Sequence, residues 1–191
     1  MAEAKEKSDS ELIGLAKENP ESFGLLMERY QGPLFHYVRR LTQGTHEEIE
    51  DLLQEIFIKI YQHLNEYESS LKFSSWAYRV AHNHVVDHFR KISARPKADA
   101  LEEKEWETLI RASIDPEKDF SNRDCLDRIK ECLEDLPLQY KEILILRFLE
   151  EKSYDEIMDI LKKPKGSVAT LIARGRGKLL DKMREKNINC F

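Results

Sequence analysis

The sequence predicts an all-α fold of two small helical domains joined by a linker, with the C-terminal domain a helix-turn-helix. Apolar residues recur at spacings of three and four along most of the chain, as they do on the buried stripe of a helix. No stretch alternates apolar and polar residues as a half-buried strand does. Only seven glycines and six prolines occur in 191 residues, which suits helices. The apolar stripes form two groups with a charged stretch between them, so two cores are expected.

The first domain is expected at residues 10–93, after a disordered N-terminus at 1–9. Residues 10–41 predict two helices, with Pro20 and Pro33 as interruptions. The clearest amphipathic segment is 47–64, whose core stripe consists of Leu53, Ile56, Phe57, Ile60 and Leu64. A further stripe follows a polar turn at 68–72 and consists of Trp76, Val80, Val85, Phe89 and Ile92.

A linker is expected at 94–123, because this stretch combines prolines and many charges with few apolar residues. Thirty extended residues at about 3.3 Å each reach roughly 100 Å, enough to hold two domains on separate sites. The second domain is expected at 124–187, followed by a tail at 188–191. Its predicted helices are 125–136, 140–149, 154–161 and 167–186.

The last two of these helices have the layout of a helix-turn-helix. Ser153 and Glu156 predict a capping box, a turn with Gly166 follows, and Ser167 is expected to cap the second helix. The inner stripe of that helix is Val168, Ile172, Gly175, Leu179 and Met183. Base contacts are expected from the outer residues Ala169, Thr170, Ala173 and Arg174, and phosphate contacts from Lys162, Lys163, Lys165, Arg176, Lys178 and Lys182. The alternative is an αα-hairpin with a solvated basic face.

Two basic zones lie in an otherwise acidic chain. The net charge is −5, yet residues 71–97 carry six basic and one acidic residue, and residues 162–191 carry nine and two. A protein that contacts a polyanion at two places has this distribution. Solvated helix faces are the alternative explanation.

Two surfaces of the first domain fit binding. Asp51, Gln54, Glu55, Ile58 and Gln62 share the helix face opposite the core, which fits a protein-docking surface as well as a solvated face. Residues 73–91 interleave aromatic and basic side chains, a pattern that suits stacking with unpaired bases. Phe73 and Trp76 fit the core equally, and for Trp76 the core is the preferred interpretation.

Three stretches carry a resemblance to a known family. They are EDLLQEIFIKIYQHL at 50–64, FSSWAYRVAHNHVVDHFRK at 73–91 and KSYDEIMDILKKPKGSVATLIARGRGKL at 152–179. In this order they resemble a bacterial RNA polymerase sigma factor of the extracytoplasmic-function (ECF) group of the sigma-70 family. The resemblance spans residues 10–187 and implies a region-two domain at 10–93 and a region-four domain at 124–187.

The resemblance implies a subunit that directs RNA polymerase core, through its β′ and β subunits, to the −10 and −35 promoter elements and aids promoter opening. The residues that match the polymerase-docking surface are Asp51, Gln54, Glu55, Ile58 and Gln62. The −10 contacts fall at Phe73, Ser74, Trp76, Arg79, Asn83, His84, Asp87 and Arg90, beside a loop at 67–75 that captures a flipped base. The −35 contacts fall at Ser153, Tyr154, Lys165, Ser167, Ala169, Thr170, Ala173, Arg174, Arg176 and Lys178.

The chain departs from the family pattern in its last helix. Members often carry basic residues where this chain has Ala169 and Leu171. Gly175 and Gly177 also lie inside the helix, each costing up to about 1 kcal/mol relative to Ala. Base contacts to the −35 element would then rest on Thr170 and Arg174, or the promoter sequence differs.

No enzymatic activity, cofactor or metal is expected. His84 and His88 are spaced to share a zinc ion, but HExxH, GxSxG and Gly-rich phosphate loops are absent. Three cysteines without a CxxC, and no apolar run of about 18 residues, predict a cytoplasmic protein without membrane insertion. The expected partners are RNA polymerase core, promoter DNA and, as for many members of the group, an anti-sigma factor. The alternative function is a stand-alone helix-turn-helix transcriptional regulator.

Overall fold

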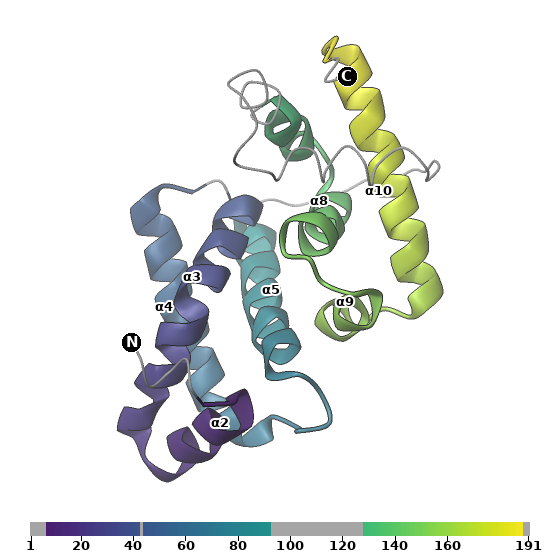
Figure 1. Ribbon diagram of the computed structural model, residues 1–191. Coiled ribbons are helices and arrows are strands. Elements are labelled where there is room, and N and C mark those ends of the chain that lie inside the picture. Colours follow the sequence, from purple (N-terminus) through teal and green to yellow (C-terminus); the bar gives the residue numbers. More distant parts are fainter. Residues whose placement is uncertain (1–6, 43, 93–127, 189–191) are drawn as a thin grey trace. The chain divides into compact units, whose positions relative to one another are not determined.

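The computed structural model describes residues 7–42, 44–92 and 128–188, and these residues confirm the all-α class (Figure 1). The elements in chain order are α2 (Asp9–Glu18), η1 (Pro20–Ser22), α3 (Phe23–Thr42), α4 (His46–Gln62), η2 (Leu64–Glu66), α5 (Phe73–Ile92), a helix at 128–134, α8 (Leu138–Leu144), η3 (Ile145–Leu149), α9 (Tyr154–Leu161) and α10 (Lys165–Glu185). The predicted linker at 94–123 lies outside the described residues. No helix in the described ranges is long and apolar enough to cross a bilayer.

The chain divides into two compact units, Met1–Ala94 with Asp155–Lys162 and Arg95–Tyr154 with Lys163–Phe191. In the first unit α3 packs against α2, α4 and α5, and α4 packs against α5 (Figure 1). The predicted stripe of α4 and η2 is confirmed, since Leu53, Ile56, Phe57, Ile60 and Leu64 are all buried.

The buried face of α5 differs in part from the predicted stripe. Trp76 and Val85 are buried, but Val80 and Phe89 are only half-buried. Ala77 and Ala81 are fully buried instead. These small residues allow close approach of the neighbouring helices, a signal that a search for large apolar residues overlooks.

Both prolines of the N-terminal segment were predicted to interrupt helices, and only one does. Pro20 begins η1, where the side chain of Asn19 accepts a hydrogen bond from the Glu21 amide. Pro33 lies inside α3, which continues unbroken from Phe23 to Thr42, so the predicted interruption there is wrong. The preceding residue is Gly32, and the absence of a Cβ relieves the clash that normally drives a residue before proline out of the helical region.

Serine and threonine caps fix the starts of two helices. Ser8 and Glu11 form a capping box on α2, and Thr45 and Glu48 form one on α4. Helix α2 therefore begins at Asp9, one residue before the predicted start. Of the N-terminus predicted to be disordered, residues 1–6 lie outside the described residues.

The second unit has its core between α8 and α10. The predicted helix at 140–149 begins earlier, at Leu138, and its second half is the π-helical turn η3. The predicted inner stripe of α10 is confirmed, because Val168, Ile172, Gly175, Leu179 and Met183 are buried. Helix α10 begins at Lys165 with Pro164 at the N-cap, so the predicted cap at Ser167 is wrong. Pro164 has the extended backbone of an N-cap residue, with φ −67° and ψ 154°, and its side chain makes no cap hydrogen bond.

Gly175 lies where α10 meets α8. A Cβ at this position would lie 3.2 Å from Leu144 Cγ, closer than ordinary carbon contacts. Leu144 is itself buried, with 2% of its surface exposed. The glycine that seemed a cost to the helix therefore allows close approach of the two helices.

Two glycine-to-alanine changes in α10 should have opposite effects. Gly175→Ala should lower the free energy of unfolding by about 1 kcal/mol, because overpacking outweighs the gain in helix propensity. Gly166→Ala places its Cβ in open space and should raise it by about 0.5 kcal/mol. Urea unfolding of both variants measures the difference, and equal stabilisation by the two alanines would contradict the packing argument.

Candidate functional site

The solvent face of α4 carries the predicted docking residues. Asp51, Gln54, Glu55, Ile58 and Gln62 are all exposed, as the helical pattern predicted. Ile58 has 55% of its surface in solvent. An isoleucine this exposed, surrounded by carboxylates and amides, fits the centre of an interface with a polar rim.

Sequence reasoning missed Tyr61 on the same helix. Its side chain is 43% exposed, and its ring packs edge-on against Phe23 of α3 with the centroids 5.1 Å apart. Tyr61 lies three residues after Ile58, so the two side chains are neighbours on the helix surface. Its spacing of three residues from Ile58 is the sequence signal that places Tyr61 on this face.

His84 of α5 reaches α4 rather than open solvent. The side chain is 9% exposed, and its Nε2 lies 3.1 Å from Oε2 of Glu55. His84 was predicted to lie near DNA, and its burial contradicts a direct contact. The position instead ties α5 to a residue of the exposed α4 face.

Two more residues predicted to contact DNA belong to the core. Phe73 and Trp76 are 3% and 6% exposed. Phe73 packs edge-on against Tyr30 and Tyr67, and Trp76 packs against Tyr67 at a centroid separation of 5.6 Å. Neither ring can stack on a base in this arrangement, so direct contact is corrected to a structural role.

The remaining α5 residues present a smaller polar surface. Asn83 and Asp87, four residues apart, are exposed on one face, and Ser74 and Arg79 are half-buried. The side chain of Arg90 lies outside the described residues. The Asn83 amide is therefore an exposed group on this helix that can both donate and accept hydrogen bonds.

A hydrogen-bonded turn precedes α5. The Tyr67 hydroxyl donates to the carbonyl of Leu71 at 2.5 Å, and the Leu71 amide donates to the carbonyl of Glu68 at 3.2 Å. Burial, with a smaller effect of the Asp9 charge, raises the pKa of the Tyr67 hydroxyl. The phenol therefore stays protonated and remains the donor at neutral pH.

In the C-terminal helices most predicted −35 residues are accessible. Ser153, Lys165, Ser167, Thr170 and Arg174 are exposed. The half-buried members of the set are Tyr154, Ala169, Ala173 and Lys178. The Thr170 hydroxyl donates to the carbonyl of Gly166 at 2.7 Å, so this side chain is left to act as an acceptor.

Arg176 is the exception in this set. Its side chain is buried at 5% exposure, which contradicts the predicted phosphate contact. Lys141 and Glu142 of α8 are buried in the same unit. Burial lowers the pKa of Lys141 and raises the pKa of Glu142 to about 7, a shift that the charge of Lys163 partly opposes. These charged groups are part of the interior of the second unit.

The turn before Tyr154 is held by Arg147. The guanidinium lies over the Tyr154 ring, 5.6 Å from its centroid, and donates to the carbonyl of Lys152 at 3.2 Å. Arg147 thereby orders the segment that carries Ser153 and Tyr154.

Lys162, directly after α9, has an unusual backbone. Its φ is 52°, in the left-handed region that costs a residue with a Cβ about 1 kcal/mol. Its side chain is exposed, as a phosphate contact requires. With lysine at this position the folded protein is less stable than it would be with glycine.

Lys162→Gly should therefore raise the free energy of unfolding by about 0.5–1 kcal/mol and weaken DNA binding, lowering the log–log salt slope by about 1. The control is Asn187→Gly, which changes a residue with φ of 51° at the end of α10. Because asparagine tolerates this conformation, the control should gain only a few tenths of a kcal/mol. Urea unfolding and a salt titration of binding measure both effects, and an unchanged salt slope for Lys162→Gly would contradict the phosphate contact.

The exposed acidic and apolar helix face on one unit and the exposed basic helix after a turn are the features of a two-domain helix-turn-helix protein. Residues 26–95 match the family described as sigma-70 region 2, and residues 126–179 match sigma-70 region 4. The chain belongs to the ECF group of the sigma-70 family, whose members direct RNA polymerase core to promoters.

Relatives that align over most of the chain belong to the same group. The chain is 28% identical over 178 residues to the ECF RNA polymerase sigma factor SigW of Bacillus subtilis, covering 88% of this chain and 92% of SigW. It is 28% identical over 191 residues to the ECF RNA polymerase sigma-E factor of Haemophilus influenzae, covering 95% and 98% of the two chains.

Two solved structures share the fold. CnrH, in complex with the cytosolic domain of CnrY, superposes with a TM-score of 0.67 at 20% identity and covers 94% of this chain and 99% of its own. The sigma factor RpoE of Bartonella quintana, in complex with the anti-sigma factor NepR, has a TM-score of 0.62 at 16% identity and covers 86% and 98%.

Proposed function

We propose that this sigma factor docks on RNA polymerase core through the exposed face of α4. The observation that carries the proposal is Ile58, which is 55% exposed between the polar residues Gln54 and Gln62. Burying such a side chain at the centre of an interface is favourable, whereas leaving it in solvent has no structural benefit. Tyr61 extends this apolar centre.

We further propose a division of promoter recognition between residues 10–93 and 124–187. For the −10 element the structure favours Asn83 and Asp87, with Ser74 and Arg79 at the margin. For the −35 element it favours Lys165, Ser167, Thr170 and Arg174, with Ser153 and Tyr154 at the start of α9. Each site alone binds weakly, and the chain between them raises the effective concentration of the second site once the first is engaged.

An anti-sigma factor is proposed as a further partner. RpoE of Bartonella quintana has this fold and crystallised in complex with the anti-sigma factor NepR. The exposed apolar centre on α4 is a surface that such a partner can cover in place of the polymerase. In the proposed role the protein is not an enzyme, and it acts in the cytoplasm, where polymerase and chromosomal DNA meet.

The test is transcription in vitro with sigma-free bacterial RNA polymerase core on fragmented genomic DNA, with and without this protein. Discrete new 5′ ends are expected, and the sequences upstream of them define the −10 and −35 elements. A folded sample that gives no starts and does not co-elute with core would instead favour a stand-alone helix-turn-helix regulator.

A further inference from the structure

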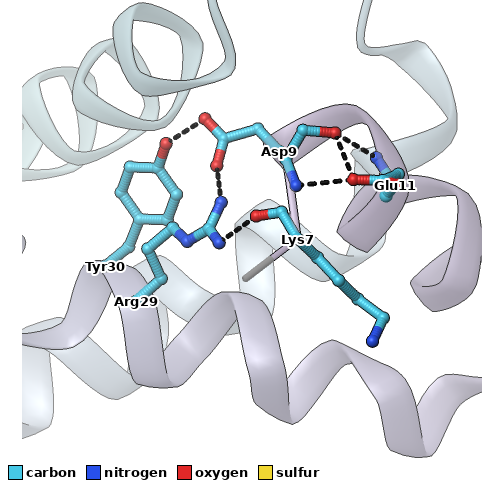
Figure 2. Close-up of polar contacts among 6 residues, drawn as sticks. Lys7, Asp9, Glu11, Arg29 and Tyr30 are labelled. Atoms are coloured by element: carbon cyan, nitrogen blue, oxygen red, sulfur yellow. Dashed lines mark hydrogen bonds and ion pairs between the residues drawn. The ribbon is translucent and has the colours of Figure 1, made fainter. Parts of the chain in front are cut away.

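A polar cluster ties α2 to α3 (Figure 2). The Asp9 carboxylate accepts hydrogen bonds from Arg29 Nη1 and from the Tyr30 hydroxyl, each at 2.5 Å. A second guanidinium nitrogen of Arg29 donates to the carbonyl of Lys7. The ionic side chains of Arg29 and Asp9 are only 23% and 33% exposed, so water competes little with these bonds.

The cluster continues into the aromatic core of the first unit. The Tyr30 ring packs edge-on against Phe73, the first residue of α5, at a centroid separation of 5.2 Å. Phe73 packs edge-on against Tyr67 at 5.4 Å. Tyr67 in turn donates to the Leu71 carbonyl and closes the loop that leads to α5.

This chain of contacts joins two segments far apart in sequence. Asp9, Arg29 and Tyr30 form the clamp. The Tyr30 ring reaches the core, and it is held at one end by Asp9 and at the other by Phe73. Burial, followed by the bond to Asp9, raises the pKa of the Tyr30 hydroxyl far above its ordinary value, so the donor is permanent. A ring fixed at both ends leaves Phe73, and through it Tyr67, little freedom to move.

We propose that Asp9, Arg29 and Tyr30 are positioning residues for −10 recognition, because they fix the 67–72 loop and the start of α5 through Phe73 and Tyr67. This inference rests on the proposed function and on the resemblance, which implies that the loop at 67–75 captures a flipped base. None of the three residues needs to contact DNA. Loosening the clamp should slow the capture of the base while leaving the α4 face and the C-terminal helices unchanged.

The experiment compares Asp9→Asn and Tyr30→Phe with the parent protein in complex with core. Both substitutions keep side-chain size, and Tyr30→Phe keeps the ring in the core. Glu11→Gln is the matched control, since Glu11 caps the same helix through Ser8 without contacting α3 in the clamp. Promoter opening should fall about fivefold in the two clamp variants and less than twofold in the control, with core affinity within twofold throughout.

Abasic templates distinguish a loss of base capture from a general loss of structure in the first unit. Each non-template position of the −10 element is made abasic in turn on one mapped promoter. At the captured position the parent and clamp variants should open at the same rate, because there is no base to take up, whereas their difference persists at the other positions. Unchanged opening by the clamp variants, or a difference that persists at every position, would overturn the inference. If the parent protein starts no transcription with core, the proposed function fails first and the inference fails with it.

Discussion

Ile58→Asp should weaken binding to RNA polymerase core at least tenfold while changing the free energy of unfolding by less than about 0.5 kcal/mol. The stability should hold because Ile58 is already 55% exposed in the folded chain, so its replacement removes little buried area. The binding should fall because a carboxylate would be desolvated at the centre of an interface, beside Glu55 and Asp51. Fluorescence titration of labelled protein with core measures the first effect, and urea unfolding measures the second.

The matched control is Met27→Asp on α3. Met27 is also an exposed apolar side chain, at 37%, but it lies outside the proposed docking set. This variant should bind core within about threefold of the parent. Parent-like binding by Ile58→Asp would place the docking surface elsewhere, and equal losses in both variants would extend it to α3.

The sequence predicts the helices well where a single amphipathic stripe determines them. On α4 the period of the large apolar residues identifies both the core face and the opposite face, and both are confirmed. On α5 the same reasoning fails in part, because aromatic residues beside cations fit a core and a base-stacking surface equally. The burial of Phe73 and Trp76 depends on partners from α3 and the 67–72 loop, which no local pattern contains.

The clamp on α2 was beyond sequence reasoning for a different reason. Asp9 lies 20 residues from Arg29, and nothing in the spacing of the two residues predicts that they meet. The helix start, by contrast, has a local signal, since Ser8 followed by Glu11 is a capping box. Long-range polar contacts of this kind can therefore be identified only from the folded structure.

The role of Arg176 was predictable from its angular position. It lies four residues after Ile172 and three before Leu179, both of which are on the inner stripe of α10. The assignment to phosphate contact followed from its charge alone. Position on the helix outweighs residue type here, because the neighbouring Gly175 brings α8 close to this side of α10.

Arg174→Ala should therefore weaken DNA binding and Arg176→Ala should lower stability, although the two residues are only two positions apart. Arg174 is exposed at the proposed DNA surface, so its loss should weaken binding to the −35 element by about 1–3 kcal/mol and leave stability within about 0.5 kcal/mol. Arg176 is 5% exposed, so its loss should lower the free energy of unfolding by about 3 kcal/mol. Gel-shift titrations on a mapped promoter and urea unfolding measure the two quantities for each variant.

The way in which Arg174→Ala loses DNA binding shows whether Arg174 contacts a base or a phosphate. A base contact relaxes the preference at one position of the −35 element and leaves the salt dependence largely unchanged. A phosphate contact weakens binding to all sequences alike and lowers the log–log salt slope by about 1. Because Ala169 and Leu171 offer no hydrogen-bonding side chain, Arg174 and Thr170 are the polar groups within residues 169–174 that can read a base edge. If Arg174→Ala weakens binding to all sequences equally, reading the base edge is left to Thr170. The Thr170 hydroxyl already donates to the Gly166 carbonyl and can only accept a further hydrogen bond. Thr170 should then recognise a donor in the −35 element, such as the amino group of adenine or cytosine.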